Sequence, residues 1–208
     1  MENNPLRYAD PLGDTIIIRY TDITAHKTEV AYSKGAVSPR KGDIVVLDNV
    51  SEYISNVIGD LNTIKASNDN ELNKGLTTLE NSEQIHVNEM PDPGRKNGNI
   101  PNSSSDDRNG IPTGTTTKYN PEDYRTARGE LRKPVIGLGH ELLGYGYDSD
   151  QGKTNYRSTT NGISMHEVSA VNVENRVRAS VGAPKKTTYG GNPIPANLLD
   201  DTHNKKKK

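Results

Sequence analysis

Residues 134–148 read PVIGLGHELLGYGYD, and this stretch decides how the second half of the chain folds. Pro134 suits the first turn of a helix, where no backbone N–H is needed. The apolar residues around His140 predict a buried helix that runs to about Leu143. Because two glycines follow closely, a long continuation of the helix is disfavoured.

A second helix is predicted at 163–180, where glycine and proline in VGAP stop it. It carries Glu167 and Glu174, which are seven residues apart and therefore lie on the same face. Valine and alanine residues lie beside them, so two acids are placed near an apolar face, where a carboxylate needs a partner cation. The alternative is that Glu174 pairs with Arg178, four residues on, at a solvated surface.

The remaining patterns predict an α+β fold. β-branched residues and alternation indicate strands, and apolar residues at three- and four-residue spacing indicate an amphipathic helix. The stretch 83–89 and the stretch 115–121 are interpreted as a hairpin with an oversized loop between them, and the C-terminal part is interpreted as irregular. The predicted segments are strands at 15–20, 28–33, 83–89 and 115–121, helices at 50–64, 134–143 and 163–180, a loop at 90–114 and an irregular tail at 185–208.

Composition excludes several classes of protein. Only 30% of the 208 residues are apolar, there is no cysteine, and the formal net charge is −1. No overall field therefore favours nucleic acid, and no disulfide framework or thiolate zinc site is possible. No apolar run approaches the ~20 residues of a membrane span, and residues 1–15 lack the apolar core of a signal peptide. We interpret the terminal lysines 205–208 as a solvated tail.

The dipeptide His140-Glu141 is the first half of a zinc-binding pattern, HExxH. In that pattern, two histidines four residues apart on one helix face bind one zinc ion, and the glutamate polarises the attacking water. Here Gly144 stands where the second histidine is expected. A His–Glu pair by itself is also compatible with an ordinary hydrogen-bonded pair at a helix surface.

The N-terminal stretch 3–14, NNPLRYADPLGD, resembles the end of the core of Rhs/YD-repeat polymorphic toxins. The resemblance implies that a variable toxin tip begins here. It further implies that a larger secreted carrier delivers this tip into a target cell and that a cognate immunity protein neutralises it. An ordinary pair of Asn/Pro turns is the alternative. The matching residues are Asn4, Pro5, Leu6, Asp10, Pro11 and Gly13.

Residues 44–189 resemble the effector zinc metallopeptidases typified by the NleD effector. The resemblance implies a zincin-like fold, a protein substrate, and a zinc ion bound by His140 and Glu167 with Glu141 as general base. It also implies that Glu174 and Asn175 support the ligands. The ordered residues that carry the resemblance are Tyr119, Pro121, Pro134, Leu138, His140, Glu141, Leu142, Leu143, Glu167, Ala170, Glu174, Asn175, Arg178, Gly182, Pro184 and Tyr189.

The departure from the pattern is Gly144, since glycine has no side chain with which to bind a metal. A catalytic zinc site normally has three protein ligands, so zinc binding is expected to be weak or absent unless a neighbour substitutes. The candidates are Asp148, His166 or a tyrosine, Tyr145 or Tyr147.

Two functions therefore follow from the sequence. One is a zinc-dependent endopeptidase toxin. The other is a catalytically inactive toxin variant or binding module that keeps the fold, whether the glycine is natural or engineered. The expected organisation is a junction at 1–14, a metallopeptidase-like domain at 15–189 and a basic tail at 190–208.

Overall fold

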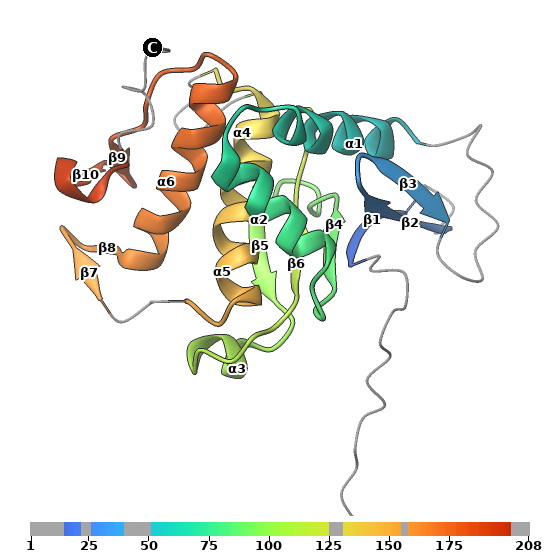
Figure 1. The fold of residues 1–208 in the computed structure, drawn as a ribbon, viewed down its shortest axis with the longest axis horizontal. Coiled ribbons are helices and arrows are strands. Elements are labelled where there is room, and N and C mark those ends of the chain that lie inside the picture. Colours follow the sequence, from blue (N-terminus) through green and yellow to red (C-terminus); the bar gives the residue numbers. More distant parts are fainter. Residues whose placement is uncertain (1–14, 22–25, 40–50, 125–130, 155–157, 201–208) are drawn as a thin grey trace, which may run out of the picture.

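The computed structural model describes residues 15–21, 26–39, 51–124, 131–154 and 158–200. The described residues form a six-stranded mixed sheet with helices packed on one of its faces (Figure 1), and two small two-stranded sheets, β7–β8 and β9–β10. The elements, in chain order, are β1 (Ile16–Thr21), β2 (Lys27–Ser33), β3 (Ala36–Pro39), α1 (Glu52–Lys65), α2 (Asn70–Glu80), β4 (His86–Glu89), β5 (Gly98–Pro101), α3 (Ser104–Arg108), β6 (Thr115–Lys118), α4 (Pro134–Leu138), η2 (Gly139–Gly146), α5 (Tyr147–Asp150), β7 (Thr159–Thr160), β8 (Ile163–Ser164), α6 (Met165–Ser180), β9 (Thr188–Tyr189), β10 (Asn192–Pro193) and η3 (Ala196–Leu198).

The sheet has six strands in the order β3-β2-β1-β4-β6-β5. The strands β1, β4 and β6 are parallel to one another, and the outer pairs β1–β2, β2–β3 and β5–β6 are antiparallel. In this register Ile16 is aligned with Tyr32 on one side and with His86 on the other. Alternate residues of each strand therefore form rows that face the helices.

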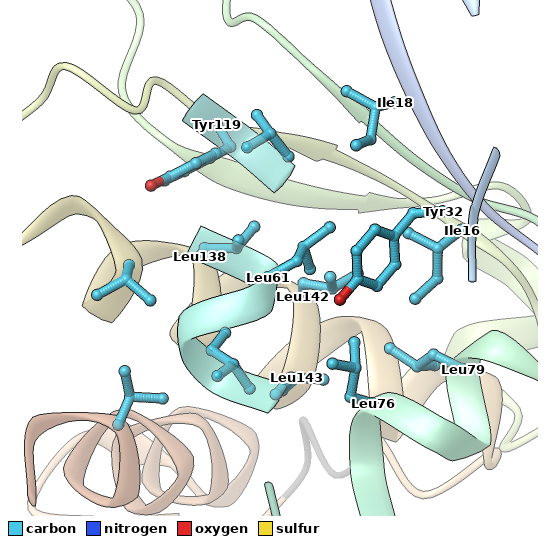
Figure 2. Close-up of a cluster of buried hydrophobic side chains, with 14 of the residues drawn as sticks. Ile16, Ile18, Tyr32, Leu61, Leu76, Leu79, Tyr119, Leu138, Leu142 and Leu143 are labelled. Carbon is cyan, nitrogen blue, oxygen red and sulfur yellow. The ribbon is translucent and has the colours of Figure 1, made fainter. Parts of the chain in front are cut away.

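The main core lies between the sheet and the helices. Its largest members come from β1, β2, α1, α2, α4 and η2, together with Tyr119 directly after β6, and Figure 2 shows side chains of this core meeting in one layer. Leu142 and Leu143 of η2 are buried in this core. Truncation of a buried leucine of this kind typically costs about 2–5 kcal/mol, so this face of η2 is held firmly against the sheet and leaves the opposite face for α6.

The α+β class is confirmed, and the predicted strands at 15–20 and 28–33 are observed as β1 and β2, which pair with each other. The predicted helix at 50–64 is observed as α1, and Ser51 caps it by accepting a hydrogen bond from the backbone N–H of Ile54 at 3.3 Å. The predicted hairpin between 83–89 and 115–121 is wrong: β4 and β6 pair in parallel, and the segment between them supplies the edge strand β5 and the short helix α3.

Two further expectations need correction. The helix that begins at Pro134 does not end near Leu143 but continues without a break to Asp150, through η2 and α5. The stretch after 184 is not wholly irregular, since β9 and β10 form a small hairpin that η3 follows. The junction motif at 3–14, the segment 44–48 and the terminal lysines lie outside the described residues.

Within the part of the chain that the structure describes, no helix has both the length and the apolar character needed to cross a bilayer.

Candidate functional site

The middle of the long helix, η2, is a π-helix, in which each backbone N–H bonds to the carbonyl five residues earlier. Such segments are rare and frequently occur at functional sites. η2 contains the whole HELLG stretch, with His140 and Gly144 buried and Glu141 half-buried. Because a turn of a π-helix contains more residues than a turn of an α-helix, the fifth residue after His140 lies nearer to the face of His140 than it would in an α-helix.

η2 and α6 lie against each other in opposite directions, and glycines set their separation. A Cβ built at Gly139 would lie 2.5 Å from Cγ2 of Val177. A Cβ built at Gly144 would lie 2.8 Å from Cβ and 2.9 Å from Cα of Ala170. The position of the expected second histidine therefore faces the backbone of α6, and a histidine does not fit there unless the helices move apart.

The antiparallel packing places His140 opposite Glu174. Nδ1 of His140 lies 3.1 Å from Oε2 of Glu174, within ion-pair distance, although this nitrogen makes no aligned hydrogen bond. Glu174 is fully buried, and Arg178 and Lys186 each approach its carboxylate to 2.8 Å. Its partners are therefore a histidine and two cations in the interior, and not solvent.

These partners decide the charge of Glu174. Burial by itself would raise the pKa of this carboxyl, but the contact with His140 and the positive charges of Lys186 and Arg178 outweigh it and lower the pKa. Glu174 is therefore ionised at neutral pH and presents a negative charge to Nδ1 of His140. The i, i+4 pairing with Arg178 that the sequence allows is present, but at a buried site.

Glu167, on the same face of α6 as Glu174 but nearer its N-terminus, lies opposite Tyr145 of η2. The hydroxyl of Tyr145 donates a short hydrogen bond to Oε2 of Glu167. Burial first, and then the neighbouring charge of Glu167, raises the pKa of the Tyr145 phenol and of the Tyr189 phenol. Both tyrosines are therefore protonated donors at neutral pH, and they converge on one carboxylate.

Aromatic rings enclose His140. Its ring lies edge-to-face with Tyr145, with 5.1 Å between the ring centroids, and is parallel to Tyr189 at 6.2 Å. The ring of His166 also lies edge-to-face with Tyr145, with 4.6 Å between the ring centroids. The ammonium of Lys186 lies 5.4 Å from the centre of the Tyr189 ring. Tyr145 is thus confined between two histidines and cannot rotate freely.

Asn175 holds the chain segment that carries Lys186 and Tyr189. Its amide group donates to the backbone oxygen of Lys186 at 2.9 Å and accepts from the backbone N–H of the same residue at 2.7 Å. Asn175 is fully buried. Its contacts are with backbone, so it positions the segment after α6 and does not face the histidine directly.

Glu141, next to His140, has a raised pKa. Burial is the main cause, and the negative charges of Glu167 and Glu174 add to it, while His140 and Arg132 act in the opposite direction. A carboxylate whose pKa is raised toward neutrality is well suited to accept and return a proton. Arg132, which lies close to Gly137 on the preceding turn, was not found from the sequence.

The other proposed replacement ligands, Asp148 and His166, face each other. Oδ2 of Asp148 lies 3.8 Å from Nε2 of His166. Burial raises the pKa of Asp148 to about 6 and lowers that of His166. Both effects favour the neutral forms of the two side chains, so burial weakens the ionic part of this pair.

The ligand set expected from the sequence is incomplete if only the usual ligand types are counted. Among the described residues, no three histidine, aspartate or glutamate side chains form a group arranged to hold a metal ion. The two expected ligands that are present, His140 and Glu167, both contact Tyr145. The structure therefore brings His140, Glu167 and Glu174 together and places Tyr145, one of the candidate replacement ligands, among them. It adds Lys186, which was not singled out from the sequence.

Comparison with known proteins identifies no relative: no protein-family model, no curated protein and no solved structure matches the chain.

Proposed function

We propose that this chain is the toxin domain of an Rhs-type polymorphic toxin and acts as a metal-dependent endopeptidase with a zincin-like site, of the NleD-like type. The observation that carries the proposal is the contact between Nδ1 of His140 and the buried carboxylate of Glu174. A histidine that binds a metal through one ring nitrogen commonly has its other nitrogen oriented by a carboxylate. Glu141 and Glu167 lie beside this pair.

The residues present fit a zinc ion in part. With Nδ1 directed at Glu174, Nε2 of His140 is the nitrogen that would bind the metal, and the carboxylate of Glu167 would bind it from α6. Zinc in such a site supplies a positive charge that polarises a peptide carbonyl and lowers the pKa of water. Gly144 contributes no third ligand, so this pair alone falls short of a normal catalytic site.

The chain's own residues would then move the protons. Glu141 accepts a proton at its carboxylate from the attacking water and returns it to the nitrogen of the leaving amine. Its raised pKa makes Glu141 a stronger base than an ordinary glutamate, which favours the first of these transfers. Glu174, held by Arg178 and Lys186, keeps the imidazole of His140 in one orientation during both transfers.

Delivery by a carrier is proposed from the motif at 4–13. On this proposal, the tip is released from an Rhs-type carrier, acts on a protein inside a target cell, and is bound by an immunity protein in the cell that produces it. The net charge of −1 gives no general attraction to nucleic acid.

The test is to express the chain in a susceptible cell and label new protein N-termini. Wild-type protein should generate new N-termini, and Glu141→Gln should reduce their rate of formation by roughly 10²- to 10⁴-fold, the usual contribution of a general base. The matched control is Glu122→Gln, which removes an exposed carboxylate in a turn. Equal cleavage by wild type and Glu141→Gln, with both folded, contradicts a peptidase that uses this site.

A second candidate is a binding module that keeps the fold without catalysis. The close contact of Gly144 with Ala170 favours it, because the second ligand position is filled by helix packing. This candidate predicts that the wild-type chain binds an immunity-type partner but produces no new N-termini and binds no metal.

A further inference from the structure

The geometry of η2 indicates which residue can replace the missing second histidine as a metal ligand. In an α-helix, residues i and i+4 share a face. A turn of a π-helix contains more residues than a turn of an α-helix, so the fourth and fifth residues after His140 share its face of the helix. Gly144, the fourth, is turned onto Ala170, and Tyr145, the fifth, lies with its ring 5.1 Å from that of His140.

We propose that Tyr145 takes the place of the second histidine, and that its phenolate oxygen, the imidazole of His140 and the carboxylate of Glu167 together bind one transition-metal ion. The inference rests on the proposed function, since it concerns the same site. It names a ligand type that the HExxH pattern does not contain.

Contacts around Tyr145 support this assignment. Its hydroxyl already reaches Oε2 of Glu167, while its ring touches the ring of His140, so it contacts both of the expected ligands. The ring of His166 also contacts it, with 4.6 Å between the ring centroids. A ligand confined in this way loses little conformational freedom when it binds a metal.

The chemistry of the three groups is consistent with one metal ion. One imidazole nitrogen and two anionic oxygens suit borderline and harder transition metals such as zinc, copper(II) and iron(III), and tyrosine is an established ligand of protein-bound iron. Binding replaces the O–H···O bond to Glu167 with metal–oxygen bonds. The phenol proton passes to solvent, so metal binding releases a proton.

The experiment uses the full chain and two metals. Zinc affinity is measured by calorimetry, and copper(II) is used as a spectroscopic probe because a copper-bound phenolate absorbs visible light through charge transfer. Wild type is expected to bind one metal per chain and to show the band. Tyr145→Phe should weaken zinc binding by roughly 10- to 100-fold or more, the range for loss of a metal-site partner, and should abolish the band.

Two further variants separate a ligand from a structural residue. Tyr147→Phe is the matched control: it removes a nearby phenol from the same helix, in a side chain that packs against the main core, and should change neither measurement. Tyr145→His should retain zinc binding but lose the band, because histidine supplies a nitrogen at the same position. Circular dichroism verifies that all variants are folded.

The outcomes separate this inference from the proposed function. Metal binding that is lost in His140→Ala but unchanged in Tyr145→Phe overturns the role of Tyr145 and leaves the metallopeptidase proposal standing. Metal binding that requires Tyr145, together with new N-termini that do not require Glu141, supports the ligand and overturns the peptidase. A wild-type chain that binds neither metal overturns the metal site as a whole.

Discussion

Gly144 packs directly on Ala170, so closely that a Cβ at position 144 would lie 2.8 Å from the Cβ and 2.9 Å from the Cα of that alanine. Two helices meet here at a separation that only glycine allows. A sequence pattern would assign the same position to a metal ligand, and the packing explains why no ligand side chain is present.

The first prediction concerns this contact. Gly144→His should not restore a metal site; it should destabilise the protein by about 1–3 kcal/mol or more, because overpacking forces the helices apart. Urea unfolding measures the change. The control is Gly59→Ala in α1, where an added Cβ meets no atom within 4 Å; it should be neutral or slightly stabilising. A Gly144→His variant that is as stable as wild type and binds zinc more tightly would contradict this account.

A second prediction concerns the buried charge of Glu174. Glu174→Gln removes the negative partner of Arg178 and Lys186 in the interior, and loss of one member of a buried ion pair typically costs about 3–5 kcal/mol. The free energy of unfolding should fall accordingly in urea titrations. Glu52→Gln, at the exposed start of α1, is the control and should change stability little. Equal losses for the two variants would show that the buried network is unimportant.

Asn175 supports a third prediction. Asn175→Ala breaks both of its hydrogen bonds to the backbone of Lys186, so the segment bearing Lys186 and Tyr189 should open more often. Hydrogen exchange at the Lys186 amide should accelerate, and stability should fall by about 1–3 kcal/mol because buried backbone groups lose their partner. Asn73→Ala, which removes one bond from a half-buried asparagine to Ser67, should affect only α2. Unchanged exchange at Lys186 would refute the anchoring role.

The fourth prediction is a pH dependence of stability at Asp150, the last residue of the α4–η2–α5 helix. Asp150 is buried beside His86, whose Nε2 lies 3.0 Å from it. Burial would raise the pKa of Asp150, but hydrogen bonds from His86, Ser82 and Gln151 and the charge of His86 lower it below its ordinary value of 3.8. Because the folded pKa is lower than the unfolded one, this carboxylate stabilises the fold above the unfolded pKa.

That stabilisation is lost as the pH falls through the ordinary value and then the folded value. Unfolding free energies of wild type and Asp150→Asn should therefore differ most near neutral pH and converge below about pH 4. Chemical denaturation of both proteins at a series of pH values between neutral pH and about pH 4 measures this difference in unfolding free energy. Asp92→Asn, in an exposed turn, is the control, and a gap that stays constant with pH would exclude Asp150 as the group responsible.

Local patterns predicted the elements whose form depends on near neighbours. Apolar residues at three- and four-residue spacing predicted α1, and β-branched residues predicted the strands β1 and β2. Glu167 and Glu174, seven residues apart on α6, both contact η2, as their spacing on one helix face requires. In each case the information lies within one segment and needs only regular helix or strand geometry.

Strand pairing in the middle of the sheet could not be predicted in this way. β4, β5 and β6 have four residues each, and the buried face of β4 and β6 carries polar residues: His86, Asn88, Thr115 and Thr117. Without an apolar alternation, the sequence does not distinguish a hairpin from parallel strands. The buried polar contacts between β4, β6 and Asp150 are made by residues far apart in the chain.

The sequence by itself determined which residues gather at the candidate site: a histidine and a glutamate on one helix, and two glutamates on the face of another. Tertiary structure decided their partners. Close packing on α6 turns Gly144 toward Ala170, and the π-helix brings Tyr145 between His140 and Glu167. The physical reason is that motif spacing assumes 3.6 residues per turn, whereas the turn of η2 is known only from the backbone hydrogen bonds of the folded chain.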